Sequence, residues 1–376
     1  MSARAVLRRG TVPPARLALR GLVRARSRAW MPASRLFVVG EGTGWSVDED
    51  AKHLEAAARR LGYEVAPSPW ARFARRQSVF LTSHFEVLTS RWLDSSHRVG
   101  VAYMHGRPGT PGVPEFDRAF DTLRGWPDRF ARVQVTHAEM HELVLEAGVD
   151  PDRVFRIPLG VDLEHFPLGG PEARRRARAE LGLPQSAFVA GSFQKDGVGW
   201  GDGLEPKLIK GPDVLVDALE RLRAVVPELV VLLTGRARGY VRRELGRRAV
   251  PHRHVERRSR RELAGAYQAL DVYIVSSRQE GGPKAALEAM AAGAPLVTTR
   301  VGQAQELVEH GRNGLLVEVE DVEALAASAA RLADDPTLAV SLRAAGRQTA
   351  EAFALERLDP RWAELLDGFV SPGNGR

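Results

Sequence analysis

The most informative segment of the chain reads Ser277-Arg278-Gln279-Glu280-Gly281-Gly282-Pro283-Lys284-Ala285-Ala286-Leu287-Glu288. It follows the apolar run 271–275, which has the length and composition of a buried strand. Pro283 suits the first position of a helix, and the alanine-rich run after it propagates a helix well. The segment therefore predicts a strand, a tight turn and a helix that begins near residue 283.

This turn has the chemistry of a sugar-nucleotide site. A helix start presents free N–H groups and the positive end of the helix dipole, both of which favour a phosphate. Lys284 adds a positive charge, and Glu280 and Glu288 can accept hydrogen bonds from hydroxyl groups. The alternative is an ordinary strand–turn–helix corner with solvated glutamates.

The surrounding motifs resemble a known family. They are the Glu-x7-Glu spacing, the strand entry 292–297, Gly302 followed by Glu306-Leu307-Val308, and the run 310–317. Together they resemble the C-terminal half of the retaining glycosyltransferases of GT-B fold, also called glycosyl transferases group 1. The resemblance implies two Rossmann-like, doubly wound α/β domains that face each other across a cleft, with a C-terminal helix that crosses back to the N-terminal domain.

The same resemblance assigns roles to the turn. It implies that Glu280 contacts the donor sugar and that Glu288 contacts the ribose, with Gly281, Gly282 and Lys284 at the donor as well. The sequence departs from the family where Gly282 and Pro283 replace an aromatic residue and a second glycine. Pro283 is also expected at the donor, but it has no N–H to give a phosphate.

A second candidate loop spans residues 191–213, between a predicted strand and a predicted helix. By resemblance, Ser192, Lys195 and Lys210 would bind the donor diphosphate, and Lys207 competes with Lys195 for that role. Two lysines stabilise the charge that grows on a leaving diphosphate, so we expect no metal and no cofactor besides the nucleotide-sugar substrate. The alternative is a glycine-rich surface hairpin with solvated lysines.

The N-terminal half offers weaker signals. The glycine-rich turn Gly42-Thr43-Gly44 lies near the end of the first predicted strand and lacks the dinucleotide spacing, so it indicates a donor or acceptor contact, or a plain turn. His105 ends a predicted strand, where α/β sheets place ligands, and by resemblance it would contact the donor sugar. His84 and His137 are the alternatives for that role.

Length and composition fit this organisation. A chain of 376 residues without cysteine fits two α/β domains in a reducing compartment, and it contains no apolar run long enough to span a membrane. We expect an Arg-rich leader at 1–34, an acceptor domain at 35–165 completed by 346–376, and a donor domain at 166–345. The run 157–162 is the expected interdomain crossing.

The net charge of +7 is concentrated in the leader. Residues 1–34 contain eight arginines and no acidic residue, which leaves a formal charge of −1 on the remainder of the chain. A nearly neutral body argues against nucleic-acid binding. The leader itself has three interpretations: an amphipathic helix on an anionic membrane, a transit peptide, or a disordered segment after a start codon placed too early.

The expected secondary structure alternates throughout. Strands are expected at 36–39, 79–81, 99–104, 133–135, 154–157, 188–191, 229–234, 271–275, 296–299 and 315–319. Helices are expected at 48–61 and 138–147, from 171 to near 182, from near 212, 260, 283, 303 and 321, and through 347 and 360–369. This alternation predicts parallel sheets covered by helices.

These observations predict a metal-independent, retaining glycosyltransferase that moves a sugar from a nucleotide-sugar donor to a hydroxyl acceptor. We expect it in the cytoplasm, with peripheral membrane contact through residues 1–34 if the leader is an interfacial helix. Two alternatives remain. One is a nucleotide-sugar epimerase of the same fold, and the other is a non-catalytic sugar-binding partner in polysaccharide assembly.

Overall fold

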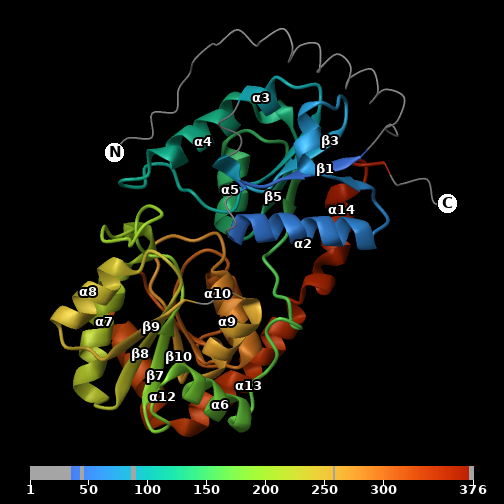
Figure 1. The fold of residues 1–376 in the computed structure, drawn as a ribbon. Helices are drawn as coiled ribbons and strands as arrows, with labels where there is room; N and C mark the ends of the chain where they lie inside the picture. Colours follow the sequence, from blue (N-terminus) through green and yellow to red (C-terminus); the bar gives the residue numbers. More distant parts are fainter. Residues whose placement is uncertain (1–34, 43–45, 86–89, 257–258, 372–376) are drawn as a thin grey trace.

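The computed structural model describes residues 35–42, 46–85, 90–256 and 259–371. They form two α/β halves, each built on one six-stranded sheet in which all strand pairs are parallel (Figure 1). The predicted fold class is confirmed. Thr43, Gly44 and residues 1–34 lie outside the described residues, so the expectations for them stay predictions.

The N-terminal sheet has the strand order β2-β1-β3-β4-β5-β6. Its strands are β1 (Leu36–Val39), β2 (Val65–Ala66), β3 (Ser78–Leu81), β4 (Arg98–Ala102), β5 (Phe130–Val135) and β6 (Val154–Arg156). Its helices are α2 (Ser46–Arg60), α3 (Ser90–Leu93), α4 (Pro114–Gly125) and α5 (Ala138–Glu146), with 3-10 turns η1 (Ser68–Arg72), η3 (Pro127–Arg129) and η4 (Pro151–Arg153). The order reverses between β1 and β3, so the crevice at their carboxyl ends is a natural ligand position.

The C-terminal sheet has the strand order β12-β11-β10-β7-β8-β9. Its strands are β7 (Phe188–Ser192), β8 (Leu229–Thr234), β9 (His252–Val255), β10 (Val272–Val275), β11 (Leu296–Thr299) and β12 (Leu315–Val317). Here the order reverses between β7 and β10. Both predicted donor loops follow these two strands, so the topology places them at the switch point where such sheets bind ligands.

Helices cover both faces of the C-terminal sheet. One face packs against α6 (Pro171–Leu181), α9 (Arg260–Gln268), α10 (Lys284–Ala292) and α13 (Pro336–Ala352), and the other against α7 (Pro212–Val225), α8 (Gly239–Arg247) and α12 (Val322–Asp334). The short elements are η5 (Leu208–Lys210), α11 (Ala304–Leu307) and η6 (Leu355–Leu358). Burial on both faces explains why β7, β8 and β10 read as continuous apolar runs.

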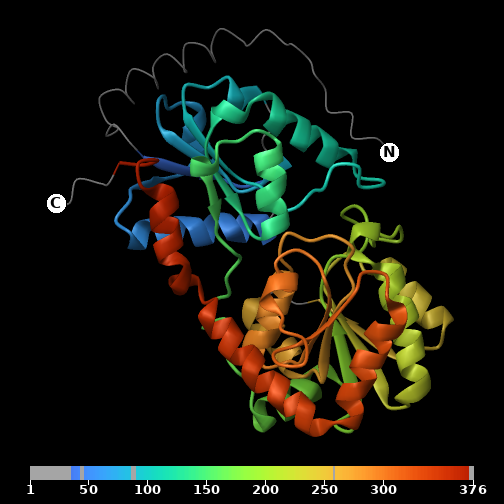
Figure 2. The same cartoon turned by 180° about the vertical axis from the view of Figure 1, so that it is seen from behind.

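The end of the chain returns to the N-terminal half, as predicted. α13 packs on α10, and after η6 the helix α14 (Asp359–Leu366) packs on α2, a crossing that Figure 2 shows from behind. Trp362 and Phe369 meet Phe80 of β3 edge to face, with ring centroids 6.2 and 6.5 Å apart. Burying each such aromatic side chain contributes about 1.5–3 kcal/mol, which ties the terminal segment to the first sheet.

The sequence missed five elements, namely the strands β2 and β9 and the helices α3, α4 and α8. β9 is an edge strand whose residues are half-buried or exposed, so its His-Arg-His-Val sequence carries no clear apolar alternation. α8 is rich in arginine and buries only Val241 and Leu245. The prediction for Pro283 was off by one position: Pro283 precedes α10 as its N-cap, with φ −68° and ψ 94°, and Lys284 is the first helical residue.

Candidate active site

The predicted residues Lys210 and Glu280 form an ion pair at the switch point of the C-terminal sheet. Lys210 Nζ donates to Glu280 Oε2 at 2.6 Å, and Ser277 Oγ donates to Glu280 Oε1 at 2.8 Å. Gln194, just after β7, donates from Nε2 to the Lys210 carbonyl at 3.0 Å. The carboxylate of Glu280 is therefore fixed by a cation and a hydroxyl group, and it is only 10% exposed.

Backbone contacts explain how residues so distant in sequence meet. Gly211 has φ +59°, and a side chain there would collide with the Ser276 carbonyl, so the Lys-Gly pair requires its glycine. The N–H groups of Arg278 and Gln279 both donate to the Ile209 carbonyl, at 2.9 and 3.0 Å. These bonds join the loop that carries Lys210 to the turn that carries Glu280.

Glu288 lies in a separate cluster, one turn further along α10 than Lys284. Tyr267 OH donates to Glu288 Oε2 at 2.9 Å, and Arg260 lies 3.6 Å from Glu288 Oε1. Burial raises the pKa of Glu288, against the opposing effects of Tyr267 and Arg260. Arg260 also pairs with Glu49 of α2 at 2.9 Å, so this cluster reaches across to the N-terminal half.

The start of α10 contacts the N-terminal half through Lys284. Its Nζ lies 2.6 Å from Asp50 Oδ1 of α2, and burial raises the pKa of Asp50. Because Pro283 is the N-cap, its missing N–H lies outside the helical donors. The departure from the family pattern therefore leaves the N–H groups of the first helical turn in place.

Gly281 lies where the two halves touch. Thr136 Oγ1 donates to the Gly281 carbonyl at 2.6 Å, and a Cβ at Gly281 would come within 2.6 Å of the Met104 carbonyl. Gly282 is similarly close to Leu159 and Gln303. Small residues are needed here because backbone of the other half approaches Gly281 and side chains crowd Gly282.

The predicted phosphate loop is anchored by a buried ion pair that the sequence did not reveal. Arg238 Nη2 lies 2.9 Å from Asp196 Oδ2, and both side chains are 0% exposed. Arg238 Nη1 also donates to the Ser192 carbonyl at 2.6 Å. Ser192, at the end of β7, is 1% exposed. Arg238 therefore fixes both the end of β7, through the Ser192 carbonyl, and the loop that follows, through Asp196.

Asp196 lies between the two competing lysines. Lys195 precedes it, with Nζ 4.8 Å from the centre of the Trp200 ring, and the Lys207 N–H donates to the Asp196 carbonyl at 2.7 Å. Burial and, to a smaller extent, the nearby charge of Lys210 lower the pKa of Lys207 to about 8. Electrostatic coupling to both Lys210 and Lys195 places Lys207 within this cationic cluster.

His105 lies on the opposite side, among uncharged rings. Burial lowers its pKa to about 3, with smaller contributions from Lys210, Lys207 and His137, so His105 is neutral at ordinary pH. The rings of His84 and His105 lie 4.9 Å apart, and both rings contact Phe116. Burial also lowers the pKa of His84 well below its usual range.

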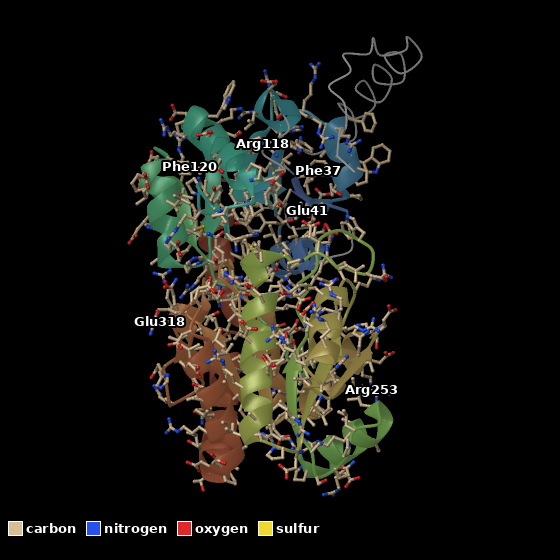
Figure 3. The ribbon with its side chains drawn as sticks, turned by 90° about the vertical axis from the view of Figure 1, so that its left-hand side faces the viewer. Phe37, Glu41, Arg118, Phe120, Arg253 and Glu318 are labelled. Atoms are coloured by element: carbon tan, nitrogen blue, oxygen red, sulfur yellow. The ribbon has the colours of Figure 1, made fainter. Side chains whose placement is uncertain are left out.

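The remaining N-terminal candidates lie on neighbouring strand ends. His137 is buried, with Nδ1 2.9 Å from Thr136 Oγ1. The Gly42 N–H donates to Asp48 Oδ1 at 2.9 Å, and Glu41 accepts from Ser83 Oγ at 2.6 Å. β1 runs from Phe37 towards Glu41 and the C-terminal half (Figure 3), and the charge of Glu41 reaches Lys207.

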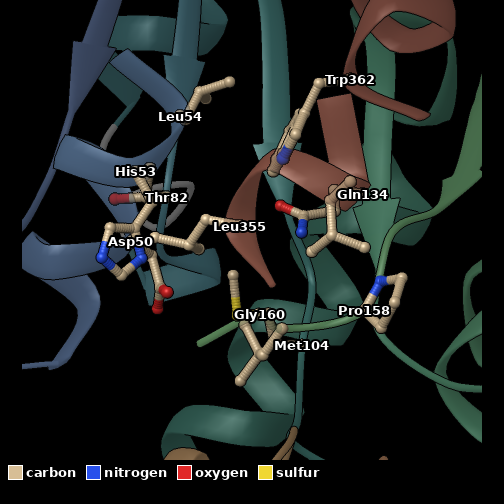
Figure 4. Close-up of a pocket in the computed structure, with 12 residues that line it drawn as sticks. Asp50, His53, Leu54, Thr82, Met104, Gln134, Pro158, Gly160, Leu355 and Trp362 are labelled. Atoms are coloured by element: carbon tan, nitrogen blue, oxygen red, sulfur yellow. The ribbon is translucent and has the colours of Figure 1, made fainter. Parts of the chain in front are cut away.

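A small cavity lies beside the crossing segment, between Asp50 and His53 of α2 and Gln134 of β5 (Figure 4). Gly160 and Trp362 also line it. Burial and, to a smaller extent, the charges of Lys284 and Arg260 lower the pKa of His53 to about 4. None of the predicted donor residues lines this cavity, but it adjoins the candidate site through the Asp50–Lys284 pair and through Met104 and Leu159, which lie against Gly281 and Gly282.

With this geometry in place, comparison with known proteins identifies the family. A model described as glycosyl transferases group 1 matches residues 203–335. The D-inositol 3-phosphate glycosyltransferase 1 of Catenulispora acidiphila is 32% identical over 308 residues, which cover 76% of this chain and 68% of that relative. The chain belongs to the group 1 glycosyl transferases. It is therefore a sugar-transferring enzyme.

Other relatives match a smaller part of the chain. The D-inositol 3-phosphate glycosyltransferase of Xylanimonas cellulosilytica is 38% identical over 237 residues, 58% of this chain and 53% of that relative. The chain thus spans about half the length of that relative.

Solved structures share the fold of this group 1 glycosyl transferase. Anabaena HepE, solved in complex with UDP-glucose, superposes with a TM-score of 0.71 at 17% identity and covers 89% of this chain and 99% of its own. Sucrose-phosphate synthase from Thermosynechococcus elongatus superposes with a TM-score of 0.66 at 19% identity, covering 90% and 99% of the two chains. At these identities the likeness establishes the fold alone.

The described residues show neither a metal cluster nor a membrane-spanning helix. In that part of the chain, no three His, Asp or Glu side chains are grouped to hold a metal ion. No helix within it is long and apolar enough to cross a lipid bilayer.

Proposed function

We propose that the enzyme transfers a sugar from a nucleotide-sugar donor to a hydroxyl group of an acceptor, with retention at the anomeric carbon and without a divalent metal. The observation that supports this proposal most strongly is the ion pair at the switch point of the C-terminal sheet, where Lys210 Nζ lies 2.6 Å from Glu280 Oε2. A cation and a fixed carboxylate, side by side at this position, match a donor with a diphosphate and neighbouring sugar hydroxyls.

The cationic side of the pair supports the leaving group. Negative charge grows on the nucleoside diphosphate as the glycosidic bond breaks, and positioned cations stabilise that charge. Lys210 and Lys207 are electrostatically coupled, and Lys195 extends the same cluster. These lysines can therefore supply the charge that a bound metal ion supplies in other transferases.

The acidic side of the pair supports recognition of hydroxyl groups. Glu280 is held by Lys210 and Ser277, so its oxygens are oriented acceptors for the donor sugar. Glu288, one turn into α10, accepts a hydrogen bond from Tyr267, and this position suits a contact with the ribose hydroxyl groups. The two acids thus serve different hydroxyls of one extended donor.

The N-terminal edge suits the acceptor and the outer face of the sugar. His105 is neutral, so it can exchange hydrogen bonds with hydroxyls but cannot act as a protonated general acid. A glycosidase needs two carboxyl groups across the scissile bond, whereas Glu280 is already paired with a lysine. We infer that an oxygen of the leaving diphosphate takes the proton of the incoming hydroxyl on the same face.

The test is to incubate the purified chain with a panel of sugar nucleotides, with and without a hydroxyl acceptor. Because HepE was solved with UDP-glucose, UDP-sugars come first. Release of nucleoside diphosphate with a new glycoside supports transfer, and NMR of the product anomer tests retention. An altered sugar without transfer would indicate an epimerase, and binding without turnover a non-catalytic partner.

The metal requirement and the membrane contact are tested in two separate experiments. Activity that persists in excess chelator supports the metal-independent mechanism, whereas loss restored by Mg²⁺ or Mn²⁺ contradicts it. Vesicle co-sedimentation with and without residues 1–34 tests the leader, because eight arginines in an acid-free stretch are expected to favour anionic lipid.

A further inference from the structure

A second pocket lies in the N-terminal half, at the opposite end of the sheet from the candidate active site. It is an open pocket of about 300 Å³, and its charged lining consists of Arg98, Arg129, Arg132, Arg153 and Asp128. Arg98 is the first residue of β4, Arg132 lies early in β5, and Arg153 immediately precedes β6. The strands are parallel, so the amino ends here face away from the candidate active site.

The charges in this arginine pocket are unbalanced. Among the described residues, Arg98, Arg129 and Arg132 have no carboxylate within ion-pair distance, and Arg153 reaches Asp128 and Asp150 only at 3.9 Å. Asp128 is fully exposed at the rim. Four guanidinium groups therefore share one open pocket with a single solvated carboxylate, so the pocket has an excess of positive charge that an anion would offset.

Backbone carbonyls hold these guanidinium groups in place. Arg129 donates to the carbonyls of Leu93 and His97 at 2.6 and 3.0 Å, and Arg132 donates to those of Leu365 and Asp367 at 2.9 and 2.7 Å. Each guanidinium has five N–H groups, so donors remain for a ligand. Because these side chains are already ordered in the folded chain, a ligand that binds them loses less conformational entropy.

Neighbouring electrostatics agree with this geometry. Burial lowers the pKa of Arg132, and the positive charges of Arg98 and Arg153 lower it further. Asp367 acts in the opposite direction, so positive charge outweighs negative charge around Arg132 without removing it. An anion within the pocket would reverse the effect.

We propose that the arginine pocket binds a phosphate group. Planar guanidinium groups match the oxygens of phosphate in paired hydrogen bonds, and several of them suit its multiple charge better than the single charge of a carboxylate. Two sources share this chemistry, a soluble phosphate compound and the headgroup of an anionic phospholipid. The site is independent of the donor site and of the proposed reaction.

The experiment compares the full chain with two double variants. Arg98→Gln/Arg153→Gln removes two pocket arginines, and Arg242→Gln/Arg331→Gln removes two exposed arginines of the C-terminal half as the matched control. Pyrophosphate binding is measured by calorimetry, and binding to phosphatidylglycerol vesicles by co-sedimentation. Pyrophosphate bound near the donor lysines is identified separately with Lys210→Ala.

We expect the pocket variant to lose about tenfold or more in affinity, the effect of removing charged hydrogen bonds, while the control keeps its affinity. If the pocket variant loses affinity for pyrophosphate but not for vesicles, the ligand is a soluble phosphate compound. If it loses affinity for vesicles, and excess pyrophosphate does not displace the vesicles from the unaltered chain, the ligand is a lipid headgroup. Equal losses in both double variants, or no binding of either probe, would overturn the proposal.

A measurement on the unaltered chain guards against a misfolded variant. Phenylglyoxal modifies accessible arginines, and mass spectrometry reports each site. Pyrophosphate or vesicles should slow the modification of Arg98 and Arg153 severalfold while leaving Arg242 unaffected. Unchanged modification of the pocket arginines under both conditions would contradict the site even if the variants could not be purified.

Discussion

The carboxyl edges of the two sheets face each other but differ in chemistry. The C-terminal edge carries paired charges, with Lys210 on Glu280 and Arg238 on Asp196. The N-terminal edge around His105 carries aromatic and imidazole rings that are neutral because burial lowers the pKa of His84 and His105. The difference indicates a division of labour, in which one edge binds the anionic nucleotide and the other meets neutral hydroxyl groups.

The largest effect is expected from the buried pair of the charged edge. Asp196→Ala leaves Arg238 buried without its counterion, which should lower the free energy of unfolding by about 3–5 kcal/mol. Urea unfolding measures this change. The control Asp196→Leu/Arg238→Met removes both charges and should cost much less; equal losses in the two variants would show that packing, rather than charge, anchors the loop.

The next effect concerns catalysis at the same edge. Glu280→Gln should leave the fold intact and lower turnover by on the order of 100-fold or more, because a charged acceptor for donor hydroxyls is lost. Steady-state kinetics with the sugar nucleotide identified by the panel provide the measurement, with thermal unfolding as the control for folding. Wild-type turnover in this variant would remove Glu280 from the site.

The neutral edge should respond differently. His105→Ala should reduce turnover by about tenfold, the cost of one or two hydrogen bonds, and His105→Asn should recover part of it. Because the pKa of His105 is about 3, it is uncharged above about pH 4, so the pH–rate profiles of wild type and His105→Asn should coincide from pH 5 to 9. A rate step near pH 6–7 that disappears in the variant would contradict a neutral role.

The smallest effect is a pH dependence of binding. Lys207 has a pKa lowered to about 8, so it is charged below pH 8 and loses its proton as the pH rises through that value. The affinity for a nucleoside diphosphate should therefore fall severalfold between pH 7 and 9 in the wild type. The fall should be absent in Lys207→Met; an identical fall in both proteins would assign the titration to another group.

The sequence predicted the charged edge better than the neutral one. Glu280 and Glu288 lie in one compact motif after a strand, so their spacing indicated a shared site, and the family resemblance added Lys210 to it. Their partners were not predictable in this way, because Arg238 follows Asp196 by 42 positions and Asp50 meets Lys284 only through the packing of two halves. The neutrality of His105 also depends on burial that no local pattern encodes.

The roles of individual residues stay predictions, although the fold and the enzyme family are established. The choice between Lys195 and Lys207 illustrates why. The structure places Asp196 between them, so both lysines flank one anchored loop. Kinetics of Lys195→Met and Lys207→Met with the same donor separate their contributions.

One comparison tests the division of labour most directly: the affinity for a nucleoside diphosphate and for its parent nucleoside, in wild type, Lys210→Ala and His105→Ala. Lys210→Ala should weaken diphosphate binding by about tenfold or more and leave nucleoside binding unchanged, because its charge meets the phosphates. His105→Ala should change neither affinity. Equal losses of both ligands in Lys210→Ala, or a selective loss of diphosphate binding in His105→Ala, would contradict the assignment of charge to one edge and neutrality to the other.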